Sequence, residues 1–192
     1  MNRRLLAAAA LLAALPALQG CITAAAVGAG TVALMTEDRR TTGVYVEDEN
    51  IEWKVLARVN SDFSAAHVNG TSFNRKVLLT GEAPTEDMKK AIEGAVKAMP
   101  EVKSVVNELV VAGNSSMTSR GNDSLITSNV KTRMVGNGKF STNHVKVVTE
   151  AGAVFLMGIV TQAEGEAAVE IARSTSGVSR VVKVFEYAEL NK

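Results

Sequence analysis

The chain contains few cysteine, histidine, proline and aromatic residues. Its 192 residues include one cysteine, two histidines and three prolines, and aromatics account for 4%. A single cysteine excludes an internal disulfide, and together with two histidines it leaves no obvious zinc site. With 46% hydrophobic residues, the composition is typical of a folded protein with an aliphatic core, and it argues against a disordered or collagen-like chain.

The sequence also lacks an excess of charge of either sign. Lysine and arginine total 21 against 20 aspartates and glutamates, for a formal net charge of +1. This balance argues against a nucleic-acid partner, because such proteins carry strongly basic surfaces. The charge is unevenly distributed, since residues 48–112 hold eight basic and ten acidic side chains, whereas residues 120–192 hold nine basic and seven acidic ones.

The first residues have the pattern of a bacterial export signal. Arg3 and Arg4 precede an apolar run over residues 5–18, which ends in Gln19-Gly20-Cys21. This pattern predicts a signal peptide over residues 1–20. Leu18-Gln19-Gly20-Cys21 resembles the lipobox, and the resemblance implies cleavage before Cys21 and lipidation of that cysteine with acyl chains such as palmitate. A free thiol in a secreted protein and an uncleaved membrane span are the alternatives.

Residues 21–46 are expected to form a tether rich in small residues behind the lipidated cysteine. Ile22 occupies the position at which an aspartate, in enteric lipoproteins, signals retention in the inner membrane. That resemblance implies an anchor on the periplasmic face of the cell outer membrane. Two or three acyl chains provide a lasting anchor, because each buried methylene contributes about 0.8 kcal/mol.

The remainder of the chain is one pattern repeated. Val77–Gly81 aligns with Val154–Gly158 at an offset of 77, and the same offset pairs His67 with His144. We therefore expect a first module over residues 47–112, a linker over 113–120 and a second module over 121–192. A module this small buries little surface, so the two are expected to pack on each other.

Both modules show the same order of predicted elements. Apolar residues at i, i+4 and i+8 predict an opening helix, with Ile51, Val55 and Val59 in the first and Ile126, Val130 and Met134 in the second. Two strands, a helix and a strand follow, over residues 67–73, 76–80, 85–98 and 102–111, and over residues 144–149, 153–157, 162–175 and 178–187. The order α-β-β-α-β predicts an α+β fold, with helices packed on one face of a small mixed sheet.

Two motifs in the second module resemble those of the BON domain family. They are Val154-Phe155-Leu156-Met157-Gly158 and Gly177-Val178-Ser179-Arg180-Val181-Val182, while the first module departs at Pro100-Glu101-Val102 and Arg75-Lys76. With a lipobox and a tether, the chain resembles outer-membrane lipoproteins that carry two BON domains. The resemblance implies binding of anionic phospholipid such as phosphatidylglycerol, support of outer-membrane integrity, and links to outer-membrane protein assembly and to regulators of cell-wall amidases.

Residues that carry catalysis are not evident in the sequence. His67 and His144 occupy equivalent positions, which favours a repeated structural role, and the carboxylates of Glu164, Glu166 and Glu170 fit the solvated side of a helix. We therefore expect no enzyme activity, no cofactor and no bound metal.

The opening helix of the second module is the candidate lipid-binding element. At about 100° per residue, Leu125, Ser128 and Val135 fall on the side opposite the apolar stripe. A helix face with apolar and hydroxyl side chains and with cations at its margin can lie in a lipid interface, because burial of the apolar side chains and attraction to anionic headgroups add. The predicted phospholipid-binding residues, partly carried over from the family resemblance, are Leu125, Ile126, Ser128, Val130, Lys131, Arg133, Met134 and Val135. Alternatively, Leu125 and Val135 pack against the first module, or the helix docks on a protein partner as part of an interaction scaffold.

The corresponding helix of the first module places Trp53 outward. The acidic neighbours Asp48, Glu49 and Glu52 would be repelled by anionic lipid. We therefore expect Trp53 to pack between the two modules rather than to enter a membrane.

Overall fold

The computed structural model describes residues 38–113 and 117–189. The predicted signal peptide, Cys21 and residues 21–37 of the predicted tether lie outside the described residues, as do residues 114–116 of the predicted linker. Within the part of the chain that is described, no helix is both long and apolar enough to cross a bilayer.

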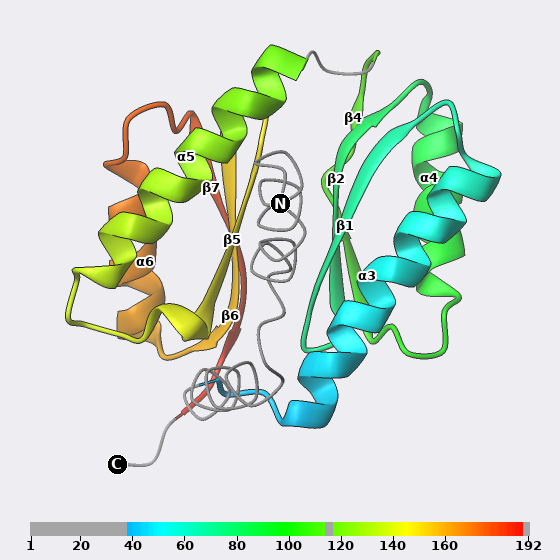
Figure 1. Cartoon of the computed structure of the whole chain (residues 1–192). Helices are drawn as coiled ribbons and strands as arrows, with labels where there is room; N and C mark the ends of the chain where they lie inside the picture. Colours follow the sequence, from blue (N-terminus) through cyan, green and yellow to red (C-terminus); the bar gives the residue numbers. More distant parts are fainter. Residues whose placement is uncertain (1–37, 114–116, 190–192) are drawn as a thin grey trace, which may run out of the picture. The chain divides into compact units, whose positions relative to one another are not determined.

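The first lobe consists of two helices over one face of a mixed sheet (Figure 1). Helix α3 (Thr42–Asp62) leads to the hairpin β1 (His67–Phe73) and β2 (Lys76–Ala83). Helix α4 (Glu86–Lys97) then returns the chain so that β3 (Ser104–Asn107) and β4 (Val110–Val111) pair with β2 in parallel.

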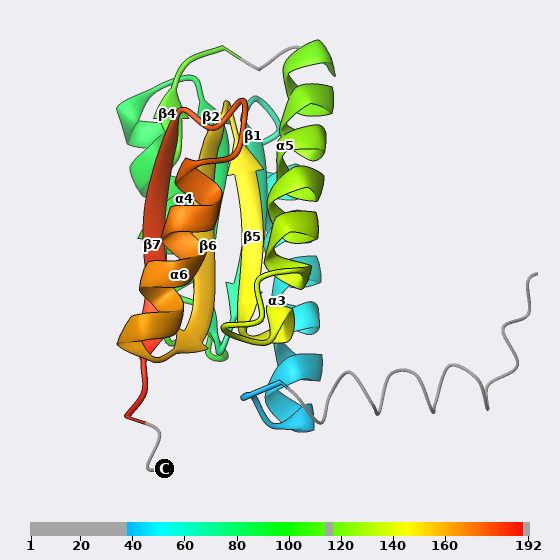
Figure 2. The same ribbon diagram turned by 90° about the vertical axis from the view of Figure 1, so that its left-hand side faces the viewer.

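The second lobe repeats this arrangement with α5 and α6 over its sheet (Figure 2). Helix α5 (Met117–Val135) and a short 3-10 turn, η1 (Thr142–His144), precede the hairpin β5 (Val145–Glu150) and β6 (Ala153–Val160). Helix α6 (Gln162–Arg173) begins with a capping box between Thr161 and Glu164, and it leads to β7 (Arg180–Tyr187), which is parallel to β6.

The predicted α-β-β-α-β order and the mixed sheet are confirmed in both lobes. One strand differs, because the last strand of the first lobe is interrupted between β3 and β4. There the Asn107 side chain accepts a hydrogen bond from the amide of Leu109 at 3.1 Å, and the Leu109 side chain is buried in the core. The local turn at Asn107 breaks the ladder that the run of β-branched residues predicted.

The strands alternate between two buried faces, which explains why their sequences are almost continuously apolar. In β2, Val77 and Leu79 join the core beneath α3 and α4, whereas Leu78 belongs to a different cluster. That cluster combines Leu78 and Phe73 of the first lobe with side chains of the second lobe, including Phe155. Because successive side chains of a strand point to opposite faces, each sheet packs on its own helices and on the other sheet. The two lobes therefore share a core, as the small size of each module predicted.

A buried aspartate in the opening helix of each lobe holds the hairpin turn of that lobe. The Asp48 carboxylate accepts hydrogen bonds from the amides of Asn74 and Arg75, each at 2.8 Å. The equivalent Asp123 accepts from the amides of Ala151 and Gly152 at 2.9 and 2.8 Å. Asp48 therefore does not belong to an outward acidic flank as the sequence suggested, because its carboxylate satisfies amides that the turn leaves unpaired.

A candidate membrane-contact surface on helix α5

The apolar stripe of α5 forms the core of the second lobe. Ile126, Val130 and Met134 are 2%, 0% and 1% exposed, and all three pack against the β5–β6–β7 sheet. The prediction that these three residues contact lipid directly is therefore wrong for the folded lobe. Their spacing of four residues places them on the face that the helix buries, and a bilayer could reach them only if α5 left the sheet.

The opposite side of α5 carries two apolar side chains that nothing covers among the described residues. Leu125 is 65% exposed and Val135 is 74% exposed. Ser128 and Thr132 lie between them and are also exposed. The alternative in which Leu125 and Val135 pack against the first lobe is therefore not what the structure shows. We call Leu125, Ser128, Lys131, Thr132 and Val135 the outward surface of α5.

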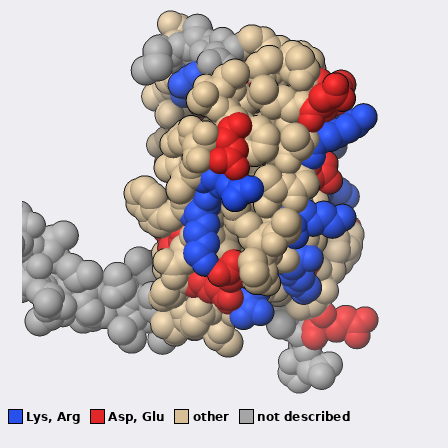
Figure 3. Space-filling view, turned by 90° about the vertical axis from the view of Figure 1, so that its right-hand side faces the viewer, with Lys and Arg blue, Asp and Glu red and all other residues tan. Residues whose placement is uncertain are grey.

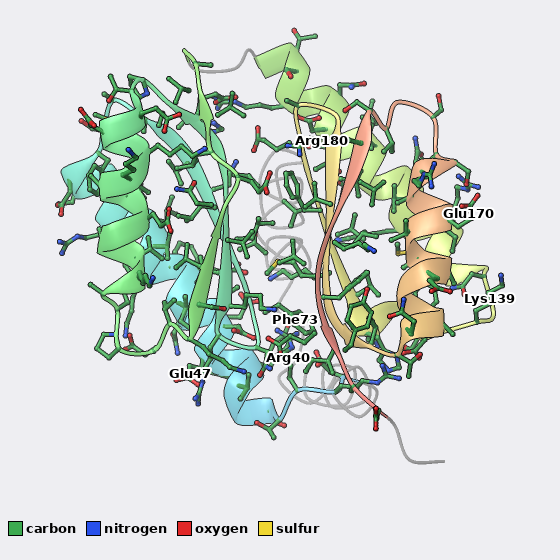
Figure 4. All side chains as sticks on the ribbon, turned by 180° about the vertical axis from the view of Figure 1, so that it is seen from behind. Arg40, Glu47, Phe73, Lys139, Glu170 and Arg180 are labelled. Carbon is green, nitrogen blue, oxygen red and sulfur yellow. The ribbon has the colours of Figure 1, made fainter. Side chains whose placement is uncertain are left out.

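The charges around this surface are positive. Lys131 is exposed, and Lys139 extends from the loop that follows α5, away from the body of the lobe (Figure 4). The acidic side chain of α5, Asp123, is buried at the hairpin turn, so the exposed side of residues 118–135 presents no carboxylate. An anionic headgroup would therefore meet attraction without local repulsion on this side of the helix.

Arg133, a predicted lipid-binding residue, has a different role in this structure. Its guanidinium donates hydrogen bonds to the carbonyl oxygen of Ile171 at 3.1 Å, to Oγ1 of Thr175 at 2.7 Å and to Oγ of Ser174 at 3.0 Å. These groups lie at the C-terminal end of α6, where the helix dipole favours a cation. Arg133 therefore holds α5 against α6, and both of its terminal nitrogens already donate to groups of α6 and the residues that follow it.

Helix α3 of the first lobe presents a different surface. Trp53 is 68% exposed, so its ring is not buried between the lobes. Its ring lies at a cavity of about 510 Å³ that both lobes line, with Glu49 and Glu52 on one side and residues 147–150 of the second lobe on the other. Glu52 also accepts a hydrogen bond from Nζ of Lys146 of the second lobe at 2.6 Å. Trp53 therefore lies beside the contact between the lobes without being buried in it. Figure 3 shows acidic and basic side chains interspersed on the face toward the viewer.

The two histidines lie beside carboxylates rather than beside a nucleophile. Nδ1 of His67 is 3.0 Å from Oε2 of Glu82, and Nδ1 of His144 is 3.5 Å from Oε1 of Glu164. Glu164 is in turn held by Arg39 through two hydrogen bonds of 2.6 and 2.8 Å. Burial alone would raise the pKa of Glu164, but the hydrogen bonds from Arg39 and from the amide of Thr161 lower it to about 2. A carboxylate that stays ionised at neutral pH in an ion pair is suited to fastening the chain rather than to proton transfer.

Comparison with known proteins agrees with the repeat and with the fold. The BON domain family model matches residues 47–113 and 122–189. Over 184 residues the chain is 40% identical to the outer membrane lipoprotein DolP of Haemophilus influenzae, and the alignment covers 94% of this chain and 95% of that protein. It is 33% identical over 155 residues to the 21 kDa hemolysin of Actinobacillus pleuropneumoniae, with coverage of 79% and 80%. It is 27% identical over 144 residues to the osmotically-inducible protein Y of Escherichia coli, with coverage of 72% of each chain. The chain therefore belongs to the BON domain family and is a two-domain outer-membrane lipoprotein of the DolP type.

Proposed function

We propose that this protein is a non-enzymatic lipoprotein that recognises anionic phospholipid through the outward surface of α5 and thereby supports outer-membrane integrity. The observation that carries the proposal is the exposure of Leu125 and Val135 on a helix side that holds lysine and no exposed carboxylate. A solvated helix usually covers its outer side with charge of both signs, and the outward surface of α5 departs from that rule.

The expected binding energy is modest and has two parts. Full burial of a leucine or valine side chain contributes about 1.5–3 kcal/mol, so partial insertion of Leu125 and Val135 would contribute about 2–3 kcal/mol together. Lys131 and Lys139 would each add about 1 kcal/mol beside an anionic leaflet. The sum corresponds to weak, reversible contact, which suits a domain already tethered by an acylated Cys21, because the tether raises the effective concentration of the surface.

The test uses residues 38–192, which contain every described element and all three core clusters but not the predicted anchor. The fragment is sedimented with vesicles of phosphatidylcholine alone and with vesicles that also contain phosphatidylglycerol. We expect binding to rise with phosphatidylglycerol content, to fall with added salt and to weaken about fivefold or more in Lys131→Glu, because reversing a charge removes one attraction and adds one repulsion.

Lys90→Glu is the matched control, since Lys90 is an exposed lysine on helix α4 of the other lobe. This variant has the same net charge as Lys131→Glu, so a loss confined to Lys131→Glu assigns the effect to α5 rather than to overall charge. Binding that ignores phosphatidylglycerol content and is unchanged in Lys131→Glu would contradict the proposal. The same result would favour the alternative, in which α5 docks on a protein partner of envelope assembly or amidase regulation.

A further inference from the structure

A histidine and two glutamates from both lobes come together at one edge of the contact between the sheets. His67 begins β1, Glu82 lies near the end of β2, and Glu150 ends β5. His67 and Glu82 are direct partners in the β1–β2 ladder. Both side chains lie on the face of the first sheet that packs against the second lobe, because they are an even number of residues from Phe73 and Leu78 of the shared core.

The spacing of the three groups is close to that of metal ligands. Nδ1 of His67 is 3.0 Å from Oε2 of Glu82, and one ligand atom from each of the three residues lies within 4.8 Å of the others. Ligands at about 2.0–2.1 Å around a tetrahedral Zn²⁺ are about 3.3 Å apart, so the carboxylate oxygen of Glu150 would need to move by at most about 1.5 Å. Glu150 is the last residue of its strand, so rotation of its side chain can supply that movement.

A second feature of the same face points to a bound species. Thr80 is 1% exposed, and among the described residues its Oγ1 has no hydrogen-bond partner. Thr80 lies two residues before Glu82 on β2 and pairs with Asn69, so its side chain is on the same face as His67 and Glu82. A buried hydroxyl without a partner costs about 1–3 kcal/mol. A water molecule in the coordination shell of a cation would give this hydroxyl the partner that the protein does not supply.

The ligand types select the class of cation. One imidazole and two carboxylates suit Zn²⁺ and similar divalent transition metals, whereas Ca²⁺ and Mg²⁺ prefer oxygen ligands alone. Asn69, which donates from Nδ2 to Oε2 of Glu150 at 3.0 Å, would orient that carboxylate. Asn69 and Glu150 also line the cavity of about 510 Å³, which gives an ion a route from solvent.

We propose that His67, Glu82 and Glu150 form a binding site for a divalent transition-metal ion such as Zn²⁺, which clamps β2 of the first lobe to β5 of the second. Two of the ligands come from the first module and one from the second, so the site requires the docked arrangement of the lobes. Metal binding would stabilise that arrangement, because an ion that binds only the folded, docked protein shifts the unfolding equilibrium.

The test is titration of the untagged full chain in detergent, stripped with chelator, with ZnCl₂ in a calorimeter. We expect one saturable equivalent of Zn²⁺, and an affinity at least about tenfold weaker in His67→Gln and in Glu150→Gln. His144→Gln is the matched control, because His144 is the equivalent histidine of the second lobe and lies beside Glu164 instead. Its affinity for Zn²⁺ should equal that of the unmodified protein.

Two further measurements separate loss of the site from loss of the fold. Thermal unfolding in metal-free buffer should show that Glu150→Gln is as stable as the unmodified chain, and added Zn²⁺ should raise the melting temperature of the unmodified chain but not of this variant. Co²⁺ should give a visible absorption band that disappears in the same variant. The proposal is overturned if the unmodified protein takes up no saturable equivalent, or if Glu150→Gln and His67→Gln bind as tightly as His144→Gln. Either result would leave the His67–Glu82 contact as a hydrogen bond within the fold.

Discussion

The ion pair between Arg39 and Glu164 should make the stability of the protein depend on pH in the acid range. Arg39 precedes α3 and belongs to the N-terminal side of the first lobe, whereas Glu164 lies in the first turn of α6. Arg39 also donates to the carbonyl oxygen of Ile159 at 2.8 Å, so this one side chain connects the segment before α3 to the second lobe. We choose Glu164→Gln as the perturbation because glutamine can still complete the capping box with Thr161.

The sign and size of the contribution of Glu164 to the unfolding free energy follow from its lowered pKa. The pKa of Glu164 is about 2 in the folded chain against an ordinary value of 4.5. The carboxylate therefore stabilises the fold fully above pH 4.5, and this contribution is lost as the pH falls from 4.5 toward 2. At about 1.36 kcal/mol per pKa unit, the ionised carboxylate can stabilise the fold by at most about 3 kcal/mol. Solvent screening of the Arg39–Glu164 pair reduces the expected stabilisation to about 1–2 kcal/mol.

The assay is urea unfolding of the unmodified chain and of Glu164→Gln at pH 7 and at pH 3. We expect the difference in unfolding free energy at pH 3 to be roughly two fifths of its value at pH 7. Other carboxylates titrate in both proteins and cancel in this comparison. An equal difference at the two pH values would refute the reasoning, because it would mean that the charge of Glu164 contributes nothing.

Four further substitutions are tested with the same unfolding assay at pH 7. Gly81→Ala should destabilise the fold by about 3 kcal/mol, because φ is +110° and a Cβ would lie 2.2 Å from the carbonyl oxygen of His67; Gly94→Ala in α4, where nothing lies within 4 Å, should instead stabilise it by about 0.5–1 kcal/mol. Phe155→Ala should cost about 3–5 kcal/mol, because its ring is buried in the core that the two lobes share, and a cost below 1 kcal/mol would mean that the sheets do not pack in solution. Trp53→Ala should change stability by less than about 0.5 kcal/mol, since the ring is largely exposed, and it should leave vesicle binding unchanged; a loss of binding would place the lipid contact on α3.

The fold could be predicted because its signals are local and occur twice. Ile126, Val130 and Met134 repeat the spacing of the first opening helix, and the structure buries all three in the core. That spacing identifies a buried face but not what covers the opposite one. Exposure of Leu125 and Val135 depends on how the lobes pack, because the second sheet, rather than α5, lies against the first lobe, and no local pattern encodes that arrangement.

The parts that could not be predicted depend on contacts between residues far apart in the sequence. The carboxylate of Asp48 is buried because amides 26 and 27 residues later need an acceptor, and no local pattern distinguishes it from an exposed acid such as Glu49. Arg133 resembled a free surface cation because its partners at the end of α6 are about 40 residues away. The cluster of His67, Glu82 and Glu150 draws on both modules, so neither copy of the repeat contains it.

The central claim is that α5, and not α3, meets the membrane, and site-specific labelling tests it directly. Residues 38–192 contain no cysteine, so Leu125→Cys and, in a second variant, Leu56→Cys on α3 can each carry a single environment-sensitive fluorophore. On vesicles that contain phosphatidylglycerol and nitroxide-labelled lipid, we predict a blue shift and quenching for the label at position 125 and neither change for the label at position 56. A label at position 125 that stays in water, or equal responses at both positions, would contradict the account.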